Sequence, residues 1–147
     1  MTYRPWTYED IYAVAALEKE CFSDPWTFRM LADSFFAESV LTLLAEEGGE
    51  VAGYAVFSVL FEEAELADIA VAPKFRRRGI EEGLLGRLEG QARRMGAERI
   101  LLEVRVSNVP AMSLYLKRGY AGCGVRTRYY ADGEDALIMQ KRLAEGE

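Results

Sequence analysis

The sequence predicts an α/β fold of the α+β kind, with a mixed, mostly antiparallel central sheet and helices on both of its faces. The expected elements run in the order β, α, α, β, β, β, α, β, α, β, β. Two β-α-β passages, around residues 64–104 and 99–130, allow a parallel pair in the middle of the sheet. The 147 residues contain no repeat, low-complexity tract or linker, so we expect a single domain over 1–147.

The boundaries of the elements follow from hydrophobic periodicity and from turn-forming residues. Strands are expected near residues 3–4, 40–45, 51–61, 64–71, 99–106, 121–130 and 135–142. Helices are expected at 8–21, from 27 onward, at 79–95 and from 110 to 119. Gly96 and Gly119 stop the last two helices. Gly48-Gly49 and Asp132-Gly133 are the expected hairpin turns.

Polar residues mark the starts of the first two helices. Thr7-Tyr8-Glu9-Asp10 resembles a capping box with Asp in place of Glu. Ser23-Asp24-Pro25 breaks the first helix, and Thr27 is expected to cap the second. Three glycines of the third helix lie on the side away from its leucines: Gly83, Gly86 and Gly90. Either another group packs closely against them or the helix is weak.

Composition and charge narrow the possible function classes. The net charge of −6 argues against sequence-independent binding of nucleic acid, and it would suit a cationic substrate. The chain has no histidine, so a general base must be Glu, Asp, Tyr, Cys or Lys, or a water held by one of them. Cys21 and Cys123 have no CxxC spacing, which favours buried reduced thiols over a zinc site. No apolar run reaches membrane length and the first twenty residues lack a signal pattern, so we expect a cytoplasmic protein.

A basic loop before the third helix is the clearest candidate binding motif. The four cations within residues 74–78 precede a helix N-terminus, where the macrodipole disfavours positive charge. An anionic ligand would offset this cost, because backbone N–H groups and arginines converge there. The alternative is a solvated basic face. Glu81 and Glu82 follow the loop, and they either pair with Arg77 or Arg78 or occupy N–H groups that a phosphate would use.

Two longer segments carry a wider pattern, ELADIAVAPKFRRRGI and ILLEVRVSNVPAMSLYLKRGY. They resemble the GNAT superfamily of acetyl-CoA-dependent N-acetyltransferases, whose pyrophosphate loop reads R/Q-x-x-G-x-G/A. Four features are similar to the bacterial ribosomal-protein alanine N-acetyltransferases, the RimI type: CFSDPW, LEVR-x-SN, A-x-x-LY-x-x-x-GY and RTRYYADGEDALIM. The resemblance covers about residues 3 to 142. It implies a GNAT-like fold and acetyl-CoA as co-substrate, without a metal.

The same resemblance implies which residues bind acetyl-CoA. Backbone N–H groups of one strand would stabilise charge on the acetyl carbonyl oxygen: Ile69, Ala70 and Val71. The pyrophosphate would bind the loop and the first helical turn: Arg76, Arg77, Arg78, Gly79, Ile80, Glu81 and Glu82. Asn108 resembles a cofactor-contacting asparagine, with a helix cap as the alternative. Glu81 replaces the small residue of the motif, and we expect it to turn aside so that the anion still binds.

The resemblance also implies the catalytic pair. Glu103 would be the general base, directly or through water, and Tyr115 the general acid for the departing thiolate. The residues alone leave two alternatives open, in which Glu103 is a surface residue paired with Arg105 and Tyr115 is a packing residue. Four aromatic residues are expected to border the acceptor groove, with structural packing as the alternative: Phe22, Trp26, Tyr129 and Tyr130.

The pattern as a whole predicts transfer of acetyl from acetyl-CoA to the N-terminal α-amino group of an alanine in a small-subunit ribosomal protein. An α-amino group has a pKa near 8, well below about 10.4 for lysine, so deprotonation needs only modest help. Acetylation of lysine side chains or of a small amine is one alternative. A non-catalytic binding module, with a cofactor site impaired by Glu81, is another. Neither nucleic acid nor a membrane is expected as a direct partner.

Overall fold

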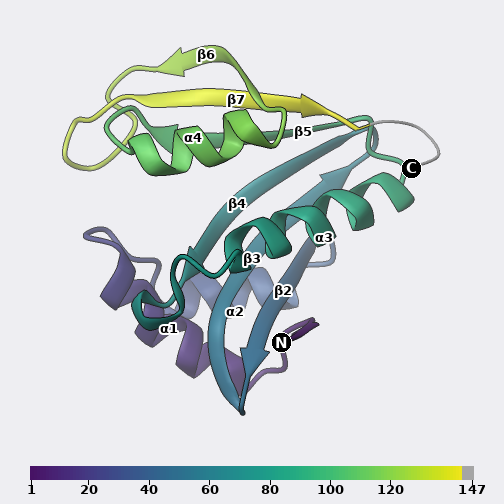
Figure 1. The fold of residues 1–147 in the computed structure, drawn as a ribbon, viewed down its shortest axis with the longest axis vertical. Helices are drawn as coiled ribbons and strands as arrows, with labels where there is room; N and C mark the ends of the chain where they lie inside the picture. Colours follow the sequence, from purple (N-terminus) through teal and green to yellow (C-terminus); the bar gives the residue numbers. More distant parts are fainter. Residues whose placement is uncertain (144–147) are drawn as a thin grey trace.

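In the computed structural model, which describes residues 1–143, the chain forms one seven-stranded sheet with helices on both faces (Figure 1). The strands are β1 (Thr2–Arg4), β2 (Val40–Glu47), β3 (Glu50–Leu60), β4 (Glu63–Val71), β5 (Arg99–Arg105), β6 (Ala121–Arg126) and β7 (Ala136–Arg142). The helices are α1 (Asp10–Cys21), α2 (Phe28–Phe36), η1 (Pro73–Phe75, a 3-10 turn), α3 (Ile80–Arg94) and α4 (Val109–Lys117). The predicted fold class is confirmed. In this described part of the chain, no helix is long and apolar enough to cross a bilayer.

The strand order is β1-β2-β3-β4-β5-β7-β6, and every neighbouring pair is antiparallel except β4 and β5. The expected parallel pair therefore comes from the first β-α-β passage alone. The second passage gives none, because β7 lies between β5 and β6. The exposed side chains of β6 suit an edge strand, whereas Ala136 and Met139 of β7 are buried in the sheet interior.

The helix starts follow the expected caps in part. Thr27 Oγ1 accepts a hydrogen bond from the Met30 backbone N–H at 3.2 Å, as predicted. The first helix begins at Asp10, about two residues later than predicted. Asp10 Oδ2 accepts hydrogen bonds from both the backbone N–H (2.6 Å) and the hydroxyl (3.0 Å) of Thr7. Of the two hydrogen bonds of a capping box, only the one from the Thr7 backbone to the Asp10 side chain therefore forms.

Two hydrophobic layers flank the sheet. One layer packs α1 and α2 through Ile11, Val14 and Leu31, and the other packs α3 through its leucines. The ring of Tyr3 lies against Gly83, and any Cβ at this position would collide with the Tyr3 hydroxyl. Close packing therefore explains one of the three glycines of α3.

The sheet opens into a cleft between its two central strands. Glu63–Glu65 pair with Arg99–Leu101, and beyond this short ladder β4 and β5 diverge (Figure 1). The register of β3 and β4 also shifts, because Val56 faces Asp68 and Phe57 faces Leu66. The extra residue forms a bulge, and bulges redirect side chains near functional sites.

The strand β6 is shorter than predicted and ends at Arg126, not near residue 130. The following loop is held by its own hydrogen bonds. The Arg128 backbone N–H donates to Asp135 Oδ1 at 2.8 Å, and the Tyr130 N–H donates to the Glu134 carbonyl at 3.2 Å. Residues 129 and 130 consequently lie in a loop at the cleft instead of within a strand.

Candidate active site

Two adjoining cavities occupy the cleft. The first, about 630 Å³, lies between β4, the basic loop and the N-termini of α3 and α4, and we call it the cofactor cavity. The second, about 730 Å³, lies between β4, β5, the α1–α2 loop and the loop before β7, and we call it the acceptor cavity. They meet at shared lining residues: Cys21, Phe22, Ile69, Glu81, Asn108 and Ala111. A group bound in one cavity can therefore reach a group bound in the other.

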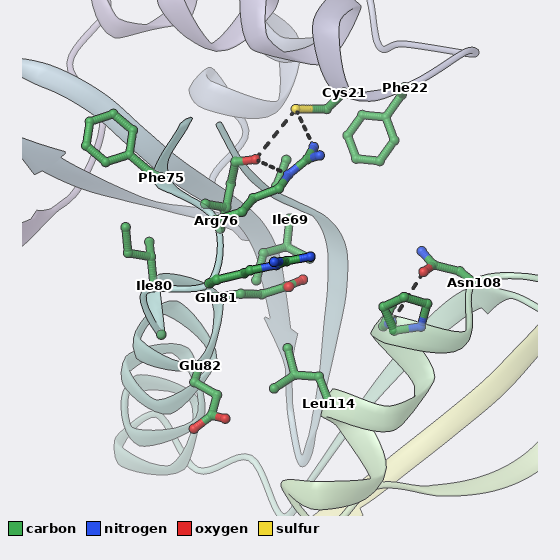
Figure 2. Close-up of a pocket in the computed structure, with 16 residues that line it drawn as sticks. Cys21, Phe22, Ile69, Phe75, Arg76, Ile80, Glu81, Glu82, Asn108 and Leu114 are labelled. Carbon is green, nitrogen blue, oxygen red and sulfur yellow. Dashed lines mark hydrogen bonds between the residues drawn. The ribbon is translucent and has the colours of Figure 1, made fainter. Parts of the chain in front are cut away.

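The cofactor cavity presents backbone donors at the start of α3. Gly79 adopts a left-handed conformation (φ 77°) as the N-cap and has no side chain to cap the helix. The first-turn N–H groups have no intrahelical partners, as at any helix start. Arg76 lies across the cavity, where its Nε donates to the Val71 carbonyl at 3.3 Å and its Nη2 donates to Cys21 Sγ at 3.7 Å (Figure 2). Arg77 also lines this cavity. These donors fit an anion such as a pyrophosphate.

The arginines of the loop do not all face the cavity. The Arg78 guanidinium pairs with Glu47 at 2.8 Å and lies over the Phe75 ring, outside the lining of both cavities. Glu82 pairs with Lys117 at 3.2 Å and still lines the cofactor cavity. The alternative in which Glu82 pairs with Arg77 or Arg78 is therefore wrong.

Glu81 points into the site. Its side chain extends toward the middle of the cofactor cavity, between Ile69 and Leu114 (Figure 2). Burial raises the pKa of the Glu81 carboxyl, and the positive charge of Arg76 counteracts only part of this effect. The expectation that Glu81 turns aside is wrong, because its side chain lines the cofactor cavity.

The end of β4 supplies backbone donors to the cleft. The Ala72 N–H donates to the Ala52 carbonyl of β3 at 2.8 Å, which fixes the alternation of the strand. By that alternation, the N–H groups of Val71 and Ile69 face away from β3, toward the cleft. The Val71 carbonyl agrees with this direction, because it accepts from Arg76. Ala70 lines the same cavity, but its N–H faces β3.

Glu103 and Tyr115 both line the acceptor cavity. Glu103 lies on β5 and forms an ion pair with Arg126 at 3.4 Å. Arg105 binds Asp132 and Glu134 instead, so the alternative of a Glu103–Arg105 surface pair is wrong. Tyr115 is only 4% exposed. Burial, and to a smaller extent the carboxylates around it, raise the pKa of its hydroxyl, which keeps it a proton donor at neutral pH.

The four predicted acceptor-groove aromatics come together around the acceptor cavity. They arrive from two loops on opposite sides of the cleft: Phe22, Trp26, Tyr129 and Tyr130. The two tyrosine rings pack edge to face with centroids 5.1 Å apart, and Arg105 stacks over Tyr130 at 4.1 Å. Burial, followed by the Glu103 carboxylate, raises the pKa of the Tyr129 hydroxyl.

Asn108 is a helix cap, as its alternative predicted, and it also lines both cavities. Its Oδ1 accepts from the Ala111 backbone N–H at 3.2 Å and caps α4 (Figure 2). The same residue lines both cavities. The cap fixes the side chain at the junction of the cavities, where its amide can also contact a ligand.

Four acidic residues that line the acceptor cavity were absent from the expected site: Glu18, Asp24, Glu65 and Asp68. Two of them, Asp68 and Glu18, have a carboxylate oxygen that is shielded from solvent. Asp68 follows Ala67 in the β4 bulge, and burial raises its pKa to about 7 despite the neighbouring Ile69 N–H. Glu18 is 1% exposed and lies on the same face of α1 as Ile11 and Val14. The sequence signal for Asp68 is an acid among the apolar residues of a strand, and the signal for Glu18 is an acid on the core face of a helix.

Comparison with known proteins agrees with this geometry. The acetyltransferase (GNAT) family matches residues 11–120. The chain belongs to this family. A relative from Bacillus subtilis (strain 168), a putative ribosomal protein bS18-alanine N-acetyltransferase, is 39% identical, over 93% of this chain and 92% of that protein. The ribosomal protein bS18-alanine N-acetyltransferase of Escherichia coli (strain K12) is 34% identical over 88% of this chain and 89% of its own.

The solved structure of a GNAT relative also matches this chain closely. The crystal structure of the ribosomal-protein-S18-alanine N-acetyltransferase from Escherichia coli superposes with a TM-score of 0.91 at 31% identity, covering 99% of this chain and 96% of that one. The resemblance noted in the sequence is thereby confirmed, and this GNAT chain is an acetyl-CoA-dependent N-acetyltransferase. Within residues 1–143, no group of three or more Cys, Asp or Glu side chains is placed to hold a metal ion.

Proposed function

We propose that the enzyme acetylates the α-amino group of the N-terminal alanine of a small-subunit ribosomal protein. One observation carries the proposal: the acceptor cavity, lined by Glu103 and Tyr115, joins the cofactor cavity at Ile69 and Asn108. The names of the relatives favour ribosomal protein bS18 as the substrate. The net charge of −6 suits a cationic acceptor.

In this proposal, acetyl-CoA supplies the acetyl group from the cofactor cavity. The α-ammonium of the acceptor enters the acceptor cavity between the two aromatic loops. Glu103 takes a proton from it, directly or through a water, because only the neutral amine can attack. Because the α-amino group has a pKa near 8, its deprotonation at neutral pH needs little free energy.

Two further groups complete the reaction. The N–H groups of Val71 and Ile69 would stabilise negative charge as it develops on the carbonyl oxygen. The hydroxyl of Tyr115 would donate a proton to the departing thiolate. Its place in the lining of the acceptor cavity supports this role, and the hydroxyl is protonated at neutral pH.

An activity assay tests the proposal. Purified enzyme, acetyl-CoA and a peptide that begins with Ala are incubated, and the product is identified by mass spectrometry beside a reference GNAT enzyme. We expect one acetyl group on the α-nitrogen. If the reference enzyme acetylates the peptide and this enzyme does not, the proposed substrate is wrong.

The position of Glu81 favours a weaker cofactor site than the family motif would give. A carboxylate in the pyrophosphate region adds negative charge beside a polyanion. Calorimetry with acetyl-CoA measures the consequence directly. Because the chain is an acetyl-CoA-dependent enzyme by family, we expect reduced affinity with micromolar binding retained, and an absence of binding would favour the impaired binding module.

A further inference from the structure

Asp68 is a half-buried acid with one carboxylate oxygen that lacks a partner. Its Oδ2 is shielded from solvent and has no hydrogen-bond partner among the described residues. The residue lines the acceptor cavity together with Glu103 and Tyr115. A buried carboxylate oxygen without a partner is costly, so a donor supplied by a ligand would stabilise it.

The β4 bulge gives Asp68 this position. Leu66, before the bulge, and Ile69 and Val71, after it, all pack on the side of the sheet that carries α3. Two residues, Ala67 and Asp68, therefore separate side chains that share one face, where a regular strand would have one. Asp68 lies past the last β4–β5 pair, in the part of β4 that borders the open cleft.

Among residues 1–143, no cation that lines the acceptor cavity is free to neutralise Asp68. The one basic residue that lines this cavity is Arg105, and its Nη1 already donates to Asp132 at 2.8 Å and to Glu134 at 2.9 Å. Glu103, in contrast, has Arg126 as its ion-pair partner. Of these two acids, Asp68 is the one that lacks a positive partner.

We propose that the Asp68 carboxylate binds the amine of the acceptor, accepting a hydrogen bond from its nitrogen and holding it beside Glu103 and Tyr115. This inference rests on the proposed function, in which the acceptor enters as an α-ammonium. An ammonium offers three N–H donors, so Asp68 and Glu103 can both bind one nitrogen. Asp68, Glu103 and Tyr115 all line the acceptor cavity, so one bound amine can contact them together.

The test compares Asp68→Asn and Asp68→Ala with Asp33→Asn. Asp33 lies on α2 with a side chain that is 76% exposed and lines neither cavity, so the control removes the same charge outside the site. Five quantities are measured for each protein. These are the Kd for acetyl-CoA, the KM and kcat for an Ala-starting peptide, and the affinity of the CoA-loaded enzyme for that peptide and for its desamino analogue, which begins with a propionyl group.

We expect wild-type enzyme to bind the peptide at least about tenfold more tightly than the desamino analogue, as loss of a charged hydrogen bond implies. Asp68→Ala should lower this ratio several-fold, to what Glu103 alone supports, and raise KM by a similar factor. Asp68→Asn keeps an acceptor oxygen, so its affinity ratio and KM should lie between those of wild type and Asp68→Ala. The Kd for acetyl-CoA should stay unchanged, and Asp33→Asn should behave as wild type.

An unchanged ratio in Asp68→Ala would overturn the role of Asp68, and so would a KM effect accompanied by an equal loss of acetyl-CoA affinity, because that pattern is a structural defect. The proposed function fails in a different way. If wild-type enzyme leaves the peptide unacetylated, the substrate is wrong and the inference falls with it. If wild-type enzyme acetylates the peptide and Asp68→Ala keeps the ratio, only the inference falls.

Discussion

The carboxylate of Glu103 lies 3.4 Å from Arg126, measured from Oε2 to Nε. The two residues come from β5 and β6, on either side of β7, so the pair spans a strand. This ion pair fixes the Glu103 side chain at the wall of the acceptor cavity, where its Oε2 has no hydrogen-bond partner among the described residues. Glu103 is thus paired with Arg126, while its buried Oε2 lacks a hydrogen-bond donor among those residues.

Glu103→Gln should abolish most of the activity. The amide keeps the size of the side chain but cannot take a proton, and general acid–base catalysis contributes roughly 10²–10⁴-fold. We expect kcat to fall by about that factor, with the acetyl-CoA Kd unchanged, in steady-state kinetics and calorimetry. Glu38→Gln, at an exposed position, is the charge-matched control. A loss below about threefold would assign the base to another group.

Tyr115→Phe tests the general acid, and Tyr120→Phe is its matched control. The two rings pack with centroids 5.7 Å apart, but the Tyr120 hydroxyl donates to Glu89 at 2.9 Å, away from the cavity. Tyr115→Phe should lower kcat by roughly 10²-fold or more with little change in stability. Tyr120→Phe should cost about 1–3 kcal/mol of unfolding free energy and leave kcat nearly intact. The reverse pattern would make Tyr115 a packing residue.

Replacing Glu81 should tighten acetyl-CoA binding. Glu81→Gln removes only the charge, whereas Glu81→Ala also removes the bulk that points into the cofactor cavity. We expect Glu81→Ala to lower Kd by about tenfold, roughly 1.4 kcal/mol, and Glu81→Gln by less. Because the charge effect is screened, the gain from Glu81→Gln should shrink at high salt. Calorimetry with the exposed-site control Glu98→Gln checks this, and an unchanged or weaker affinity would separate Glu81 from the pyrophosphate site.

Asp68→Asn should make stability less sensitive to pH. The folded protein raises the pKa of Asp68 from 3.8 to about 7, so between these values the folded state holds a proton that the unfolded state has lost. This proton favours folding near pH 5, and the advantage disappears as pH rises through 7. The difference corresponds to at most ~4 kcal/mol. Urea unfolding from pH 5 to 8 should show wild type losing stability relative to Asp68→Asn, while Asp33→Asn runs parallel to wild type.

Local signals predicted the elements well, because periodicity, caps and turn residues act within a few neighbours. Thr27 capped its helix as expected, and the aromatic residues of the two loops came to one cavity. The insertion of β7 between β5 and β6 was not predictable from such signals. It depends on a comparison of two whole strands, of which β6 has the more exposed side chains.

The directions of individual side chains in the site were also not predictable from the sequence. Glu81 was expected to turn aside, but its direction depends on the walls of the cavity, which distant segments supply. Asp68 was visible as an acid in an apolar strand, yet its aim into the acceptor cavity depends on a bulge set by the pairing with β3. Arg78 lies outside the cavity because Glu47, from another strand, is its partner.

The most direct test of α-amine specificity is a competition within one peptide. The peptide begins with a free alanine, carries one internal lysine, and is incubated with enzyme and acetyl-CoA at neutral pH. Fragment masses then locate the acetyl group. We predict acetylation of the α-nitrogen with the lysine left unmodified, and acetylation mainly on the lysine side chain would contradict the proposed function.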